Sequence, residues 1–216
     1  MGKINQGILD GFNGKVGTVV GYKIFGKKFM RAYVDKIHNP RTSPQQDNRE
    51  RFKTLTQLAS AFLGAINIGL QRVAKEMRNT ACNSFMRINQ GAVSVMGGEA
   101  EVDFGSLKCS LGALPKVGFG NASFAEPLTV SVAYTTNADT PRADGQDKVL
   151  LFVYQPDSNQ GILSEPALRT DGTIEMTVPS TWTGMTVHVY GFAVGDGREN
   201  SGLRSESTYV GTGVIE

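Results

Sequence analysis

The stretch GGEAEVDFG, residues 97–105, separates two patterns of apolar residues. Before it, apolar residues recur at steps of three and four, which is the period of an amphipathic helix. After it, they alternate with polar residues, which is the period of a half-buried strand. Glycine spacing and charge change at the same place. The sequence therefore predicts an α+β chain with two domains: 1–98, a β-ribbon and helical assembly region, and 99–216.

The part after this boundary predicts an immunoglobulin-like β-sandwich. GSLKCSL, residues 105–111, is the first expected strand. Five alternating segments follow between turn-rich stretches: 127–135, 147–155, 173–179, 185–194 and 205–215. About seven strands in about 115 residues is the count of such a sandwich. Trp182 lies in the loop before a strand and no Cys-Trp-Cys pattern is present, which excludes an antibody domain. We expect the fragment 100–216 to fold alone.

The junction HNPRTSPQQDNRERF, residues 38–52, predicts the start of a helix. Pro40 ends an extended segment. Thr42 or Ser43 provides a side-chain oxygen for the N-cap. Pro44 suits the first helical position because it needs no hydrogen-bond acceptor there.

An apolar stripe follows this start and continues to about Arg78. It predicts one long helix, or two helices joined near Gly64 or Gly69. The segment TACNSFMRINQGAV, residues 80–93, predicts a shorter helix with Phe85 and Ile88 facing the core. The stripe consists of Phe52, Leu55, Leu58, Ala59, Phe62, Ile66, Leu70, Val73 and Met77.

The glycine-rich stretch at residues 14–34 predicts an antiparallel ribbon. Short β-forming runs are separated by glycines, and FGKK, residues 25–28, stands where a hairpin turn belongs. Two strands alone are marginally stable in water, so the ribbon is expected to lie on another surface. No GK[ST] tail follows these glycines, which argues against a phosphate-binding loop.

The net charge of +2 conceals a basic first part and an acidic second part. Residues 1–90 hold 15 Lys and Arg against 5 Asp and Glu, while the other 126 residues hold 7 against 15. Such asymmetry favours a polyanionic partner or contacts between copies, with solvated surface as the alternative. The expected partner-binding residues are Lys27, Lys28, Arg31, Arg41, Arg49 and Arg51.

Three roles remain open for these cations. They favour an acidic protein surface, because Arg49 and Arg51 are unfavourable to the start of their own helix and need carboxylates elsewhere. Aromatic residues lie between the ribbon cations, which is also typical of proteins that bind single-stranded nucleic acid. In the third role, the junction at residues 38–52 binds no partner and serves only to start the helix.

Catalytic, cofactor-binding and metal-binding patterns do not stand out. His38 and His188 are far apart in the sequence, and Cys82 and Cys109 match no metal-ligand spacing. We expect two reduced thiols and no enzymatic activity. The opening MGKINQGILDGF has no apolar run of signal-peptide length, and no run is long enough to span a bilayer, so we expect a chain made in the cytosol.

Three segments together resemble an uncharacterised family of small proteins from gut Bacteroidales and their crAss-like bacteriophages. These are MGKINQGILDGFNGKVGTVVG, then NPRTSPQQDNRERF, then SGLRSESTYVG near the end of the chain. The resemblance brings no activity, cofactor or catalytic residue. It implies a virion protein, made in the host cytoplasm, in the role of an auxiliary capsid protein.

The same resemblance sets expectations for partners. They are the major capsid or connector subunits and further copies of this chain, and no membrane. The predicted long helix departs from ordinary decoration proteins and keeps a head–tail connector or tail component as an alternative, beside a nucleic-acid-binding protein.

Overall fold

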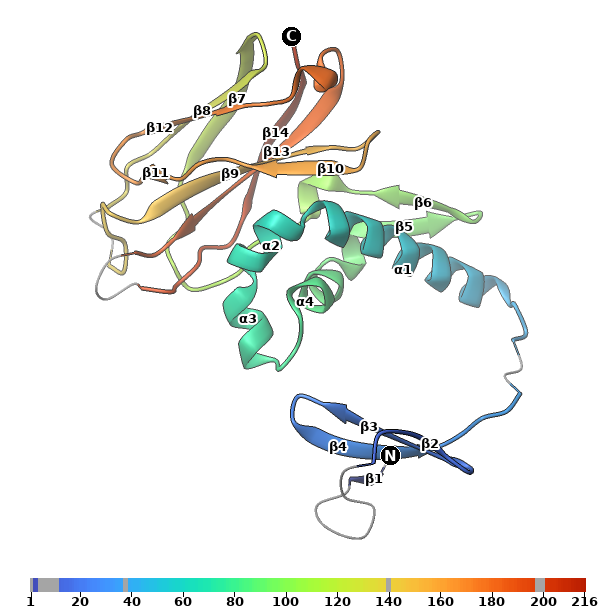
Figure 1. The fold of residues 1–216 in the computed structure, drawn as a ribbon. Helices are drawn as coiled ribbons and strands as arrows, with labels where there is room; N and C mark the ends of the chain where they lie inside the picture. The colour runs from blue at the N-terminus through green and yellow to red at the C-terminus, as the bar shows by residue number, and fades with distance from the viewer. Residues whose placement is uncertain (1, 4–11, 37–38, 139–140, 197–200) are drawn as a thin grey trace. The chain divides into compact units, whose positions relative to one another are not determined.

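The structure is a computed structural model that describes residues 2–3, 12–36, 39–138, 141–196 and 201–216 (Figure 1). The chain forms two compact units, Met1–Thr42 and Ser43–Glu216. This division differs from the one predicted after residue 98. The physical reason is that the helices of the second unit share their core with its strands, as shown below. His38 lies outside the described residues.

The first unit is an antiparallel sheet with strand order β1-β4-β3-β2. Its strands are β1 Gly2–Lys3, β2 Gly14–Val16, β3 Val19–Ile24 and β4 Lys27–Ala32. The expected ribbon and its turn are confirmed. Phe25 and Gly26 form the turn between β3 and β4 with φ of 46° and 79°. Positive φ at both central residues gives the twist that a two-residue hairpin requires.

Four helices begin the second unit: α1 Ser43–Ala61, α2 Leu63–Gly69, α3 Gln71–Glu76 and α4 Ala81–Ile88. The predicted helix start is confirmed, and the long stripe is divided into three helices. One break lies at Phe62, two residues before Gly64, and the other at Leu70, directly after Gly69; ψ is 4° at both. The shorter helix α4 is also confirmed, and Thr80 Oγ1 caps it by accepting a hydrogen bond from Asn83 N at 3.2 Å.

A hairpin lies where the domain boundary was expected. Strand β5, Val93–Met96, pairs with β6, Glu99–Val102, through a turn at Gly97 and Gly98 with φ of 63° and 87°. Both values are in the left-handed region that glycine adopts without strain. The two glycines therefore close a turn within the helical layer and do not mark a linker.

Eight strands form two sheets in the rest of the unit. One sheet has the order β10-β9-β13-β14, with β11 also paired to β9, and the other has the order β12-β8-β7. The strands are β7 Phe119–Glu126, β8 Thr129–Tyr134, β9 Lys148–Gln155, β10 Gln160–Leu163, β11 Ala167–Leu168, β12 Thr173–Thr177, β13 Thr186–Val194 and β14 Thr208–Val214. The protein is thus α+β with antiparallel sheets, and β8, β9, β12, β13 and β14 match the five alternating segments.

The strand expected at residues 105–111 is wrong. The 3-10 helix η2, Phe104–Ser106, occupies its start, and no strand follows before β7. The amides of Cys109 and Ser110 point to the hydroxyl of Ser207, at 3.0 and 3.4 Å, so side chains replace the backbone ladder here.

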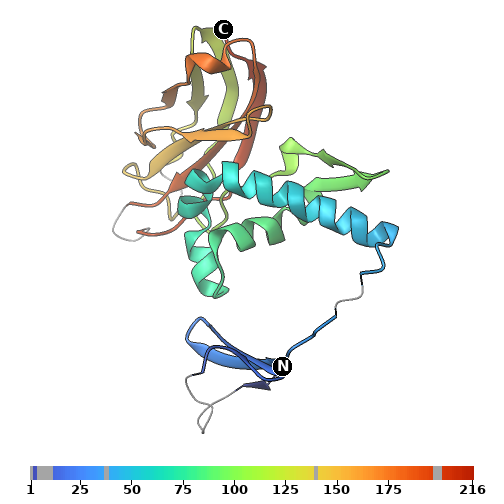
Figure 2. The same ribbon diagram turned by 45° about the vertical axis from the view of Figure 1, so that its right-hand side comes forward.

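Strands β9 and β13 are buried on both faces, which makes the second unit three layers thick (Figure 2). One face of these strands packs on the helices and the other on the sheet of β7, β8 and β12. The helix-facing side chains are Leu150, Phe152, Tyr154, Tyr190 and Phe192. The sheet-facing side chains are Val149, Leu151, Val153, Val187 and Val189. One core therefore joins the helices to the strands.

Phe62, at the break between α1 and α2, is the centre of this shared core. Its ring centroid lies 5.3 Å from that of Phe85, 4.6 Å from Phe152, 5.1 Å from Tyr154 and 5.4 Å from Tyr190. The side chain is fully buried. Aromatic groups at these separations gain free energy beyond that of their buried area.

The shared core predicts which fragments fold. Ser43–Glu216 contains both core clusters and should unfold cooperatively, with a midpoint in circular dichroism close to that of the whole chain. Residues 100–216 lack α1–α4 and expose the helix-facing side of β9 and β13, so this fragment should aggregate or melt at a much lower temperature. Equal midpoints for the two fragments would contradict the shared core.

Phe62→Ala should lower the free energy of unfolding by about 3–5 kcal/mol, because it leaves a cavity among four rings. Phe52→Ala is the matched control, since Phe52 is 61% exposed on α1. It should change the free energy by no more than about 0.5 kcal/mol. Urea denaturation measures both. Similar losses for the two variants would show that Phe62 is not the centre of the core.

Candidate interaction surface

The ribbon sheet has one face that combines cations with aromatic rings. Residues that lie opposite each other in an antiparallel pair point to the same face. Tyr22 lies opposite Phe29, Ile24 opposite Lys27, and Val20 opposite Arg31. Lys15 on β2 lies opposite Val20 and joins the same face. We call this the charged-aromatic face.

The rings of this face already make contacts within the ribbon. Tyr22 and Phe29 stack with centroids 5.6 Å apart and an interplanar angle of 21°. Lys15 Nζ lies 3.5 Å from the ring centroid of Tyr33, a cation–π contact. Each of these rings therefore presents less free π surface to an incoming base.

The opposite face of the ribbon carries Lys28. Its cross-strand partner is Lys23, so two like charges lie directly opposite each other. Phe12 covers part of this face, because its ring lies where a Cβ on Gly21 would be. Of the three expected ribbon cations, Lys27 and Arg31 thus share a face and Lys28 does not.

The described part of the ribbon contains no core of its own. Gly21 is its one buried residue, and no apolar side chain among the described residues of Met1–Thr42 is buried. The large side chains that are exposed there are Val16, Ile24, Phe25, Tyr33 and Val34. The unit also carries eight Lys and Arg against two Asp and Glu, a formal charge of +6.

The three remaining expected cations lie at or after the unit boundary. Arg41 is exposed, with φ of 51°, and precedes α1. Arg49 is exposed on α1. Arg51 is half-buried: its Nε donates a hydrogen bond to the carbonyl of Val93 at 3.0 Å, so its guanidinium ties α1 to the start of β5.

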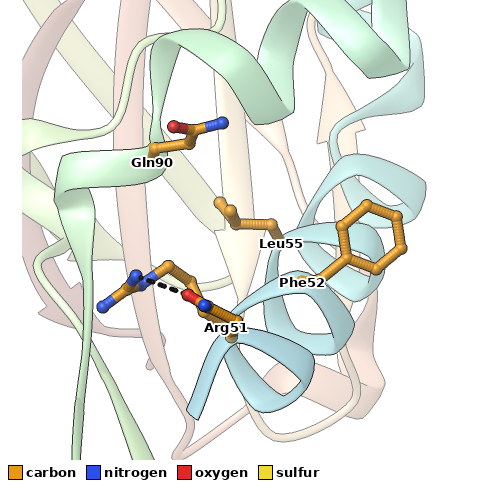
Figure 3. A pocket seen from close by; sticks show the side chains of 5 residues that line it. Arg51, Phe52, Leu55 and Gln90 are labelled. Carbon is orange, nitrogen blue, oxygen red and sulfur yellow. Dashed lines mark hydrogen bonds between the residues drawn. The ribbon is translucent and has the colours of Figure 1, made fainter. Parts of the chain in front are cut away.

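A small pocket lies beside Arg51 (Figure 3). Its volume is about 180 Å³, less than the ~300–1,000 Å³ of typical small-molecule sites, and it suits a single side chain. Arg51 Nη1 donates to Asn48 Oδ1 at 3.3 Å at its edge. The lining residues are Asn48, Arg51, Phe52, Leu55 and Gln90.

The β5–β6 hairpin adds an acidic surface that the sequence reasoning missed. Along β6, Ala100 and Val102 are half-buried against the helical core, while Glu99 and Glu101 are exposed on the other face. Met96, opposite Glu99, is 80% exposed. Neither glutamate makes an ion pair with any described residue. The alternation in EAEV directly after Gly-Gly was the signal for this hairpin.

The buried charged pair of the second unit has a structural role. Arg169 Nε lies 3.2 Å from Asp147 Oδ2, and both side chains are fully buried. Arg169 also donates to Asn137 Oδ1 at 2.6 Å and to the carbonyl of Pro115 at 3.1 Å. Burial lowers the pKa of Arg169, and Asp147 partly offsets this effect. The pair joins three of the loops that connect the strands.

Of the remaining candidate groups, Cys109 is buried, and Cys82 and His188 are half-buried. Cys82 and Cys109 are free thiols, and burial raises the pKa of Cys109 to about 12, which is opposite to the shift of a nucleophilic cysteine. His188 lies in β13, with Nδ1 2.9 Å from Tyr209 Oη, and burial lowers its pKa. Within the described ranges, no group of three His, Cys, Asp or Glu is placed to hold a metal ion. No helix among those described is long and apolar enough to cross a membrane.

A model described as "family of unknown function (DUF6266)" matches residues 11–211. The chain belongs to this family. The match begins in the first unit and ends in the last strand, so it covers most of both compact units. A comparison with curated proteins finds no match.

Arg51→Ala should loosen the β5–β6 hairpin of this DUF6266 protein. We expect faster amide hydrogen exchange at β5 and β6 and a loss of about 1–2 kcal/mol of stability, because the carbonyl of Val93 loses a charged donor. Lys53→Ala is the control: Lys53 forms an exposed ion pair with Glu50 on the same helix, worth about 0.5 kcal/mol or less. Unchanged exchange at the hairpin in Arg51→Ala would contradict this role.

Proposed function

We propose that this protein is a non-enzymatic structural component of a bacteriophage virion. Its role is that of an auxiliary capsid protein that attaches to neighbouring subunits through its ribbon. One observation carries the proposal: the ribbon is a separate compact unit with a charge of +6 and no buried apolar side chain among its described residues. A small sheet without a core gains stability by burying its apolar groups on a partner.

We propose further that the strands of the second unit form an immunoglobulin-like sandwich of seven strands, which the virion would display. Apart from the two-residue β11, seven strands make up the two sheets. The second strand, β8, pairs with β12, while the third, β9, pairs with β13, and β13 pairs with β14. The immunoglobulin fold has the same neighbours: B beside E, and C beside F beside G.

The expected partners are the major capsid or connector subunits and further copies of this chain. A head–tail connector or tail component remains the alternative, although α1 has only 19 residues and is not the single long helix that suggested it. Nucleic-acid binding is supported by the cations and rings of the charged-aromatic face. It is weakened by the contacts that those rings already make.

Purified particles test this proposal. Virions from a phage that encodes the chain, banded on a density gradient, should contain it in a fixed ratio to the major capsid protein by quantitative mass spectrometry. Reversal of Lys27, Lys28 and Arg31 to Glu should remove it from the particles. The control, with Lys53, Lys75 and Arg78 reversed, changes the net charge equally outside the ribbon and should stay bound.

Two results would overturn the proposal. One is that the chain stays at the top of the gradient while particles band without it. The other is that nuclease treatment releases it from particles, which would indicate nucleic-acid binding. Loss in both triple variants would show that net charge, not the ribbon, governs attachment.

A further inference from the structure

The tip of the ribbon and the tip of the β5–β6 hairpin have complementary chemistry. On the ribbon, Lys27 lies opposite the exposed Ile24 and follows the turn that contains the exposed Phe25, while Arg31 lies farther along β4 on the same face, opposite Val20. We call this set the ribbon patch. On the hairpin, Glu99 and Glu101 lie beside the exposed Met96. We call this set the hairpin patch. Each has an apolar group beside charges of one sign, and the signs are opposite.

We propose that the ribbon patch of one chain docks on the hairpin patch of a second copy of the same chain. The inference rests on the proposed function in one respect: it takes the ribbon as the attachment element. It adds to that function the identity of a partner, the acidic surface that receives the ribbon, and the residues that make the contact.

Charge complementarity carries the first step. The ribbon unit has a formal charge of +6, and the second unit holds 14 Lys and Arg against 18 Asp and Glu, a charge of −4. No described residue forms a salt bridge with Lys27, Arg31, Glu99 or Glu101. Opposite potentials on two surfaces steer their encounter and fix their register.

Spacing along the strands carries the second step. Side chains two residues apart on a strand lie about 6.6–6.8 Å apart, so this is the separation of Glu99 and Glu101. Lys27 and Arg31 are four residues apart on β4, or about 13 Å, with Phe29 between them. The long side chains of the two cations bracket the two carboxylates, and each cation reaches one of them.

Apolar contact carries the third step and favours a protein over a nucleic acid. Met96 is 80% exposed, and Phe25 and Ile24 are 60% and 48% exposed. A thioether packs well against an aromatic ring, and an apolar centre with a charged rim is typical of a protein interface. Base stacking would instead use several exposed rings along the face, and three of the ribbon's rings, Tyr22, Phe29 and Tyr33, already make ring contacts.

Reciprocity determines the form of the assembly. Every chain carries both patches, so two chains can exchange ribbons and form both contacts at once, or successive chains can form an open row. The ten residues between β4 and α1, 33–42, span at most about 36 Å when extended. Docking within one chain is the competing arrangement, and mixing two variants separates it from exchange.

The experiment uses two full-length charge-reversed chains. The first carries Lys27→Glu and Arg31→Glu, and the second carries Glu99→Lys and Glu101→Lys. Sedimentation equilibrium should show a dimer or larger species for the unmodified chain. Each variant alone should self-associate about tenfold or more weakly, since its two patches repel each other. An equimolar mixture of the two should recover association, because each reversed ribbon then meets a reversed hairpin.

Control variants test whether the effect belongs to these patches. Lys53→Glu with Lys75→Glu reverses two exposed cations outside the ribbon. Glu165→Lys with Glu175→Lys reverses two exposed carboxylates outside the hairpin. Both control proteins should associate like the unmodified chain. Equal weakening by the controls would overturn the assignment of the contact to the two patches.

Four further results would overturn the inference. In the first, the unmodified chain is monomeric at micromolar concentrations, and in the second, the two variants associate as strongly as the unmodified chain. In the third, the mixture of variants does not recover association. In the fourth, the frictional ratio changes without a change in mass, which indicates docking within one chain. A 20-nucleotide poly-dT oligomer that binds only with Lys27 and Arg31 intact, in a monomeric chain, would assign the face to nucleic acid. The Glu99 and Glu101 variant separates this inference from the proposed function. If one of these results overturns the inference but the variant still bands with virions, the proposed function stands.

Discussion

Both faces of strand β9 are covered by other parts of the second unit, and this burial determines how the unit is arranged. Residues 149–154 form one continuous apolar run, whereas a strand of a two-layer antiparallel sandwich alternates apolar with polar residues. The second sheet covers one side of the run. The other side needs a further layer, which α1, α2 and α4 provide with Phe62 at its centre. The helices are thus a third layer packed on the two sheets of the second unit.

The ribbon lacks this kind of support. Its strands are three-quarters or less the length of β9, and its described residues bury no apolar side chain. Hydrogen bonds and a stacked pair hold its shape, while its exposed groups remain available to a partner. The second unit supplies stability and the first supplies surface. That separation is the physical basis for the structural role proposed above.

Much of this arrangement could be predicted from local patterns of residues. The incorrect predictions concern positions where the local pattern fits more than one structure. Alternation gave β8, β9, β12, β13 and β14, and capping residues gave the start of α1. Gly97 and Gly98 were taken as a boundary because a linker and a tight hairpin use the same residues. The false strand at 105–111 depends on Ser207, which lies about a hundred positions later.

The residues of the candidate surface also divide into those that a local pattern predicts and those that it does not. Strand alternation alone separates Lys27 and Arg31 from Lys28, so that grouping could be predicted. No local pattern shows that Arg51 binds the carbonyl of Val93, 42 positions away.

Distance along the chain also affects synthesis. The apolar stripe of α1 and α2 leaves the ribosome well before β9 and β13, which cover it, so the nascent chain exposes Leu55, Phe62 and Ile66 until about residue 194 has emerged. A chaperone that holds apolar helices would protect the chain during that interval.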